Sequence, residues 1–118
     1  MFTIFGSGFG LYGYLPAIIY GLKESVCLPE VYLDTIRNRS DLRELEDKII
    51  WVEDEAIAIS LANKVVISVN PSAQIKVVQK CLDLGFSECF FLEKPLAHSP
   101  KEAKSLLHLL DKHEVDYF

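Results

Sequence analysis

The chain has 118 residues, 50% of them hydrophobic and 25% charged, which is enough for one folded domain with a substantial core. Its net charge of −5 argues against nucleic acid or an anionic membrane as the main partner, because both favour a basic surface. No apolar run reaches the ~20 residues of a membrane span, and residues 1–4 lack the features of a signal peptide. We therefore expect a cytoplasmic protein.

The three cysteines are few and widely spaced, and no histidine pairs with them in a metal-binding pattern. An odd number at this spacing fits neither a disulfide framework nor a zinc site. We expect Cys27, Cys81 and Cys89 to be packing residues, and we expect no metal site.

Short apolar segments alternate with helical patterns along the chain. Strands are predicted at residues 3–5, 24–28, 48–52, 65–69 and 88–92. Helices are predicted at residues 11–22, 41–46, 55–61, 73–84 and from 100 to about 112. Residues 30–38 fit a strand, a loop or a helix, and a β-like pattern resumes at 115–118.

Several residues predict where these helices begin and end. Ser40, Asp54 and Ser99 are expected to cap helix starts, and Ser72 is a further candidate. Gly85 is expected to end the helix at 73–84. Pro29 is expected to end the second strand. Pro16 lies within the first predicted helix, where we expect a loose or kinked start because proline removes a backbone donor.

Five strands that alternate with helices require crossover connections and a mainly parallel sheet covered on both faces. The predicted fold is therefore a three-layer, doubly wound α/β domain of the Rossmann type. Its expected strand order is 3-2-1-4-5, with a truncated sixth strand at residues 115–118 as an extension.

The first predicted strand leads into Gly6-Ser7-Gly8-Phe9-Gly10 and then into a helix. Glycines at such a turn let backbone N–H groups approach a phosphate at the helix N-terminus. The dinucleotide fingerprint is Gly-x-Gly-x-x-Gly, but Leu11 occupies its third glycine position here. No Gly-Lys-Ser/Thr follows, so the turn is not a P-loop. The pattern predicts a dinucleotide site or, without a ligand, a tight turn.

An acidic residue about 20 positions after such a turn can bind the ribose of NAD. Glu30 fits that place best and Asp34 second. Arg37 and Arg39 follow, where they could meet the 2′-phosphate of NADP. The residues leave NAD and NADP equally open, and all four side chains also fit a solvated loop.

Two further loops are predicted at the same sheet edge as the glycines. Asn70-Pro71-Ser72-Ala73-Gln74 follows the fourth strand, and Glu93-Lys94-Pro95 follows the fifth. Ligands of open α/β sheets bind at this edge, where the strand order reverses. Lys94 could bond a cofactor or substrate hydroxyl or carry a proton, although taken alone it also fits a surface lysine.

Together these loops resemble the Gfo/Idh/MocA oxidoreductases, which are NAD(P)-dependent dehydrogenases acting mostly on sugars and cyclitols. The matching segments are Gly6-Ser7-Gly8-Phe9-Gly10, Leu15-Pro16-Ala17, Asn70-Pro71-Ser72-Ala73-Gln74 and Phe91-Leu92-Glu93-Lys94-Pro95-Leu96-Ala97. The resemblance covers nearly the whole chain, and the Glu-Lys-Pro loop is its most specific part. A Gly-x-Gly-Phe-Gly turn is similar to one branch of that family, which accounts for the displaced glycine.

The resemblance implies a role for each matched residue. Gly6, Ser7, Gly8, Phe9 and Gly10 would hold the pyrophosphate of NAD or NADP. Asn70, Pro71 and Gln74 would line the cofactor. Glu93 and Lys94 would lie beside the nicotinamide, with Lys94 touching the substrate as the catalytic residue. The Lys94-Pro95 peptide bond is expected to be cis.

Family members carry a second domain that supplies most substrate contacts and the dimer surface. We expect this chain, 1–118, to correspond to the NAD(P)-binding domain alone, to meet a sugar-type substrate only in an intact protein, and to be inactive by itself. Its outer strand would leave a sheet edge open to self-association. The alternative is a non-catalytic nucleotide-sensing or assembly module with the same fold.

Overall fold

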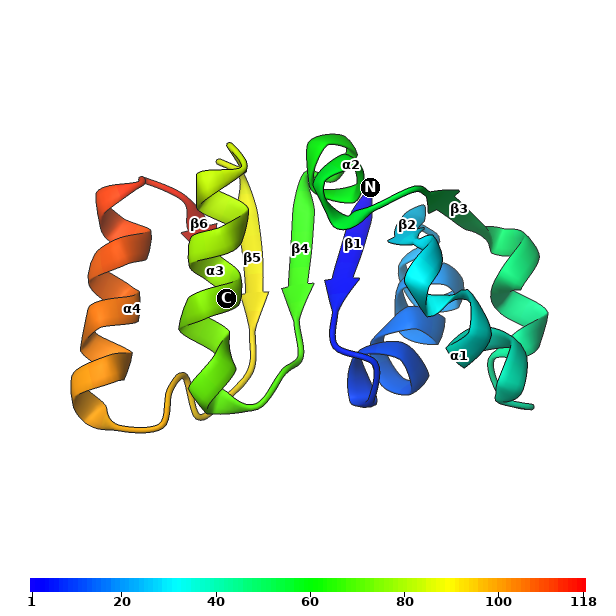
Figure 1. The fold of residues 1–118 in the computed structure, drawn as a ribbon, viewed down its shortest axis with the longest axis horizontal. Helices are drawn as coiled ribbons and strands as arrows, with labels where there is room; N and C mark the ends of the chain where they lie inside the picture. The colour runs from blue at the N-terminus through cyan, green and yellow to red at the C-terminus, as the bar shows by residue number, and fades with distance from the viewer.

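The computed structural model describes residues 1–118 as a six-stranded parallel sheet with helices on both faces (Figure 1). The strands lie in the order β3-β2-β1-β4-β5-β6, which confirms the predicted Rossmann-type fold and the predicted order. Their bounds are β1 (Phe2–Phe5), β2 (Val26–Pro29), β3 (Ile49–Val52), β4 (Lys64–Ile67), β5 (Cys89–Leu92) and β6 (Asp116–Tyr117).

The sixth strand is present but short. It pairs with β5 through Cys89 opposite Asp116 and Phe90 opposite Tyr117. The backbone of Phe118 continues the pairing, because its N–H donates to the Phe90 carbonyl and its own carbonyl accepts from the Leu92 N–H. One long edge of β6 has no neighbouring strand.

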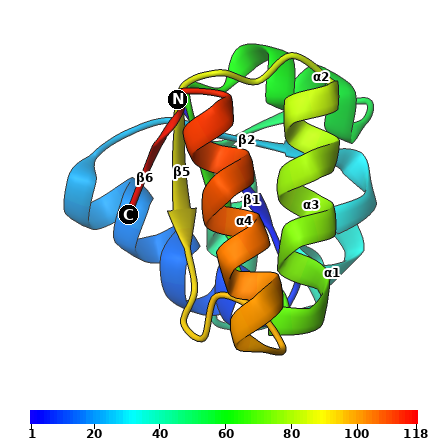
Figure 2. The same cartoon turned by 90° about the vertical axis from the view of Figure 1, so that its left-hand side faces the viewer.

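Alternate side chains of the strands fill two cores. Phe2, Ile4, Val26 and Leu28 pack on the face covered by the helix of residues 10–22 and by α1 (Leu33–Asn38). The opposite face is covered by α2 (Glu55–Leu61), α3 (Pro71–Asp83) and α4 (Pro100–Lys112). Figure 2 shows α3 and α4 on one side of β5 and the helix of residues 10–22 on the other. Strands buried on both faces are typical of a parallel sheet.

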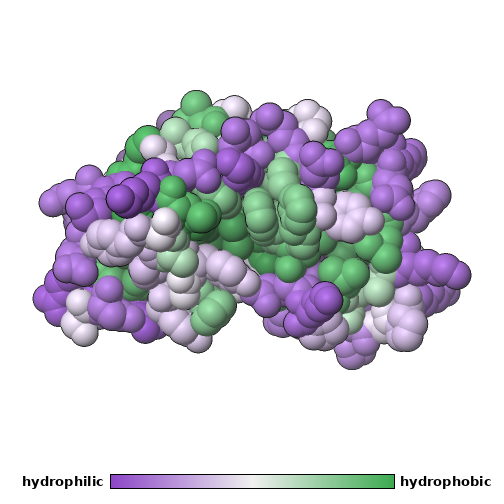
Figure 3. Space-filling view, turned by 180° about the vertical axis from the view of Figure 1, so that it is seen from behind, coloured by the Kyte–Doolittle hydropathy of each residue, from purple (hydrophilic) through white to green (hydrophobic).

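The face with the helix of residues 10–22 carries an apolar hollow over β4 and β5. Figure 3 shows that hydrophobic side chains gather in the middle of this face. The hollow has a volume of about 470 Å³ and is lined by Phe2, Tyr14, Ala17, Ile18, Gly21, Leu22, Val66 and Phe91. Tyr14 therefore stands at the boundary between this hollow and the start of the helix.

The helix predicted at residues 11–22 forms, but its turns are wider than expected. Gly10–Tyr14 and Ala17–Leu22 both have π-type turns, and Pro16 lies between them. Such turns are rare in long runs. The missing N–H of Pro16 and the crowding of its ring against the preceding turn are consistent with this local widening. The helix ends at Lys23, whose φ of 55° is left-handed.

The structure confirms the helix starts predicted at Asp54 and Ser99 and the helix end predicted at Gly85. The Asp54 carboxylate accepts from the N–H of Ile57 at 3.0 Å, and the Ser99 hydroxyl oxygen accepts from the N–H of Glu102 at 3.2 Å. Gly85 follows α3 with a φ of +94°, as expected of a helix stop. Residues 30–38, which the sequence left open, form a 3₁₀ turn at Glu30–Tyr32 followed by α1.

Two local predictions were wrong. Ser40 does not cap a helix: the segment Arg43–Lys48 is 3₁₀-helical, and the preceding turn uses the Arg39 carbonyl as its acceptor. Ser72 does not cap α3, which begins one residue earlier at Pro71, a residue whose fixed φ suits a first helical position. Pro29 is the last residue of β2, so the strand ends at this proline as predicted and includes it.

No helix in the structure is both long and apolar enough to span a membrane.

Candidate cofactor site

The glycine turn (residues 6–10) lies directly against the end of β4. β1 and β4 are parallel neighbours, and the N–H of Ser68 donates to the Phe5 carbonyl at 2.8 Å. Gly6 has a φ of +122°, and a Cβ at this position would lie 2.1 Å from the Ser68 carbonyl oxygen. Only glycine fits both requirements. The sheet order reverses between β1 and β4, which is where such folds bind ligands.

The turn exposes backbone donors at the start of a helix. Ser7, Gly8 and Phe9 are exposed, and none of their N–H groups donates to another backbone group. The Gly8 carbonyl accepts from the N–H groups of Leu11 and Tyr12, which starts the helix. No atom lies within 4 Å of the place a Gly8 Cβ would take. Open space beside free N–H groups at a helix N-terminus fits a pyrophosphate.

Gly10 accounts for the displaced third glycine. A Cβ there would lie 3.0 Å from Cγ2 of Ile4 and 3.3 Å from Cβ of Ser68. The helix therefore passes close to the sheet at Gly10. Close packing of helix on strand is the function of the third glycine in the dinucleotide fingerprint, and in this chain it falls one residue earlier.

Tyr32, and not Glu30, is the residue after β2 that reaches the turn. The Tyr32 hydroxyl accepts from the Gly6 N–H at 3.3 Å, and burial raises the pKa of this tyrosine. Glu30 is exposed at the start of the 3₁₀ turn, and Asp34 is exposed in α1. Sequence analysis missed Tyr32 because a tyrosine in an irregular segment forms no recognisable motif.

The two arginines beyond β2 are held in surface ion pairs. Arg37 binds both carboxylate oxygens of Glu46, at 2.8 and 3.0 Å. Arg39 binds both oxygens of Asp41 at 3.0 Å, and its guanidinium lies 4.9 Å from the centre of the Tyr12 ring. These bonds raise the pKa of each arginine. Arg39 thus lies near the first turn of the helix that follows the glycines.

The loop at residues 93–97 (Glu93-Lys94-Pro95-Leu96-Ala97) is anchored by a buried amide. Gln74 is fully buried, its Nε2 donates to the carbonyls of Glu93 at 3.1 Å and Leu96 at 2.7 Å, and its Oε1 accepts from the Glu93 N–H at 3.0 Å. The resemblance places Gln74 beside the cofactor; in the structure its side-chain amide binds the backbone of the loop. The Lys94-Pro95 peptide bond inside the loop is cis, as predicted.

The other loop residues lie nearer to solvent. Lys94 is exposed, and Glu93 is half-buried and accepts a hydrogen bond from the Tyr14 hydroxyl. This bond is the main reason why the pKa of Tyr14 is raised to about 12, with burial and the Glu93 charge adding to it. Asn70 is exposed before α3, and its side-chain oxygen accepts from the Ser72 hydroxyl at 3.0 Å.

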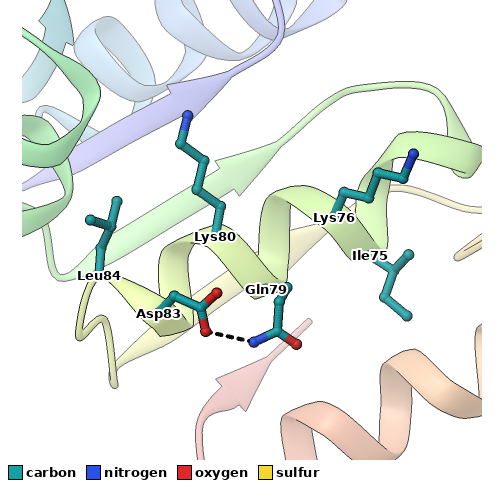
Figure 4. Close-up of a pocket in the computed structure, with 6 residues that line it drawn as sticks. All are labelled: Ile75, Lys76, Gln79, Lys80, Asp83 and Leu84. Carbon is teal, nitrogen blue, oxygen red and sulfur yellow. Dashed lines mark hydrogen bonds between the residues drawn. The ribbon is translucent and has the colours of Figure 1, made fainter.

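Two surface hollows lie on the α2 and α3 side of the molecule. One, of about 410 Å³, is lined by Pro29 at the end of β2, Val31 just beyond it, residues 53–56 after β3, Lys80 of α3 and Leu84 directly after α3. The larger, of about 560 Å³, is formed only by side chains of α3 and the residue after it (Figure 4). In that second hollow the Gln79 side chain donates to Asp83 at 2.7 Å, and Lys76 and Lys80 point away from this pair. The hollow of about 410 Å³, which lies at the ends of β2 and β3, is therefore the better candidate for extending the site at the glycine turn.

Some of the predicted site residues lie together in the fold and others lie apart. The fold brings the glycine turn, Ser68 and the Tyr32 hydroxyl together, and it ties the 93–97 loop to Gln74 and Tyr14. Glu30 forms no hydrogen bond with the glycine turn. The chain has no group of three His, Cys, Asp or Glu side chains arranged to hold a metal ion.

Solved structures share this fold over nearly the whole chain. A dehydrogenase (MviM) from Clostridium difficile is 19% identical with a TM-score of 0.67, and covers 98% of this chain and 37% of its own. The WlbA dehydrogenase from Chromobacterium violaceum, in complex with NADH and UDP-GlcNAcA, is 14% identical with a TM-score of 0.73, over 99% of this chain and 33% of its own. An oxidoreductase from Bacillus cereus is 18% identical with a TM-score of 0.64, over 99% and 33%.

The chain thus spans about a third of the length of these structures. No curated protein sequence matches it. The model of the Gfo/Idh/MocA oxidoreductase family, NAD-binding Rossmann fold, matches residues 30–118. That match covers most of the chain and identifies NAD or NADP as its cofactor. The chain therefore belongs to the Gfo/Idh/MocA family of oxidoreductases and forms a domain with the NAD-binding Rossmann fold.

Proposed function

We propose that this domain binds NAD or NADP with the pyrophosphate on the glycine turn, the adenosine toward the ends of β2 and β3, and the nicotinamide toward the 93–97 loop. The observation that carries the proposal is the set of free N–H groups at Ser7, Gly8 and Phe9 beside the open space at Gly8. The hollow lined by Pro29, Val31 and residues 53–56 supports the direction of the adenosine.

In the intact protein the domain would serve hydride transfer to or from a carbon of a sugar or cyclitol. The nicotinamide supplies the hydride chemistry when the cofactor is bound. The contribution of this chain is to orient the cofactor and to present Lys94 at the loop, where an ammonium can hydrogen-bond a substrate hydroxyl or carry a proton. Glu93 and Lys94 are the loop residues we place beside the nicotinamide, and we place Asn70 and Pro71, at the start of α3, along the cofactor.

The proposal is tested by titrating the chain separately with NADH and NADPH. Trp51 is the only tryptophan, so quenching of its emission with energy transfer to the reduced nicotinamide reports binding without a label. We expect saturable binding of at least one cofactor, and we expect Gly8→Glu to abolish it, because a carboxylate would occupy the pyrophosphate site. Saturable binding that is unchanged by Gly8→Glu would contradict the placement of the pyrophosphate.

A turnover assay separates the enzyme from a non-catalytic nucleotide-binding module. We expect the isolated chain to bind cofactor but to produce no NADH or NADPH from sugars or cyclitols. Steady production by the chain alone would contradict the proposal that substrate binding needs further protein. In an intact protein that contains this domain, loss of turnover on Lys94→Met with retained NADH binding would favour the enzyme.

A further inference from the structure

Tyr14 connects the glycine turn with the 93–97 loop. Its hydroxyl donates a hydrogen bond to Oε1 of Glu93, which lies 79 positions later in the chain. Its ring lies 5.2 Å from the ring of Phe9, centre to centre, at an angle of 79°. One residue of the helix of residues 10–22 therefore touches a member of the turn and a member of the loop.

The Phe9 end of this connection is held by packing. Phe9 stands between Gly8 and Gly10 and makes edge-to-face contacts with both Tyr12 and Tyr14. Gly13 leaves room for the Phe9 ring, because a Cβ there would lie 2.6 Å from two ring carbons. Edge-to-face aromatic pairs at these distances stabilise the fold by more than the burial of their surface alone would. The side chain of Phe9 is thus directed onto the helix although half of its surface remains exposed.

The Glu93 end is held from two sides of the sheet. Gln74, at the start of α3, binds the backbone of Glu93 and Leu96, whereas Tyr14, on the opposite face, binds the Glu93 side chain. The Tyr14 ring also forms part of the wall of the apolar hollow beside Ala17, Ile18 and Phe91. Contacts with the Phe9 ring and with the core residues of this face limit the freedom of the Tyr14 hydroxyl, so its bond to Glu93 joins the loop to a side chain whose position is constrained.

We propose that Tyr14 is a positioning residue that sets the 93–97 loop, and with it Lys94, at a fixed place relative to the glycine turn. This inference rests on the function proposed above. A dinucleotide that spans turn and loop needs both ends of its site at the correct separation. ADP-ribose carries the pyrophosphate but no nicotinamide, so its binding depends much less on where the loop lies.

The test compares Tyr14→Phe with Tyr12→Phe. Both substitutions remove one hydroxyl from a tyrosine that packs on Phe9, but only the Tyr14 hydroxyl reaches the loop. For Tyr14→Phe we expect the Kd for NADH to rise about three- to tenfold, as loss of one hydrogen bond predicts, with the Kd for ADP-ribose within about twofold. For Tyr12→Phe we expect both values to stay within about twofold of the wild type.

A ligand-free measurement distinguishes this inference from the proposed function. In ¹H–¹⁵N spectra, Tyr14→Phe should shift the amides of residues 93, 94 and 96, and Tyr12→Phe should leave them in place. Unchanged loop amides, unchanged NADH binding, or equal weakening of NADH and ADP-ribose on Tyr14→Phe would overturn the positioning role. Wild-type protein that binds neither ligand would contradict the proposed function, while the spectra would still decide whether Tyr14 holds the loop.

Discussion

The glycine turn and the 93–97 loop lie at the same edge of the sheet but are shaped by different means. The turn depends on missing side chains: Gly6 has no room for a Cβ against Ser68, and Gly10 has little against Ile4. The loop depends on side chains from elsewhere, because Gln74 and Tyr14 supply its hydrogen bonds. Substitution should therefore damage the turn by adding atoms and the loop by removing them.

The largest effect is expected at Gly6. Gly6→Ala places a Cβ 2.1 Å from a backbone oxygen at a φ of +122°, so we expect a loss of about 3 kcal/mol or more in the free energy of unfolding. Urea denaturation measures it. Gly8→Ala is the matched control, since its Cβ meets no atom within 4 Å and its stability should change by less than about 1 kcal/mol. Equal losses for the two variants would contradict the steric explanation.

The next effect is expected at Gln74. Gln74→Met has a similar size but leaves the Glu93 N–H and the Glu93 and Leu96 carbonyls without their partner, so we expect a loss of about 2–4 kcal/mol. Urea denaturation measures the loss of stability, and faster hydrogen exchange of the Glu93 amide would show that its bond is lost. Gln79→Met on the same helix removes only an exposed bond to Asp83 and should cost less than about 0.5 kcal/mol. If Gln74→Met were equally harmless, the loop would not depend on the buried amide.

A smaller, pH-dependent effect is expected from Tyr14. Its pKa is raised from the ordinary 10 to about 12 by the bond to Glu93. The contribution of this bond to stability is therefore complete below pH 10 and is lost as the pH rises toward 12. The stability difference between wild type and Tyr14→Phe should shrink across that window, as thermal denaturation at a series of pH values can show. A difference that stays constant from pH 9 to pH 11.5 would mean that the hydroxyl is not bonded to a carboxylate.

The contrast between turn and loop also explains what the sequence could predict. The strand order, the caps at Asp54 and Ser99 and the glycine turn follow from residues that are neighbours in the sequence, so their patterns were recognisable. The contacts of Tyr32 with Gly6 and of Tyr14 with Glu93 join residues 26 and 79 positions apart. No local pattern encodes such contacts. The wrong caps at Ser40 and Ser72 show a related limit, because neighbouring residues compete to set where a helix begins. At α3, Pro71 takes the first helical position and Ser72 lies inside the helix.

The smallest stability effect is expected at Lys94, and it separates the shape of the loop from its chemistry. Lys94 is exposed and forms no hydrogen bond or ion pair within the chain, whereas its neighbour Glu93 is bonded on both sides. Lys94→Met should therefore change the free energy of unfolding by less than about 0.5 kcal/mol. Urea denaturation of Lys94→Met and Gln74→Met compares a side chain of the loop with the side chain that anchors the loop. A loss as large as that of Gln74→Met would mean that Lys94 holds the loop together, and its assignment to the reaction would lose its basis.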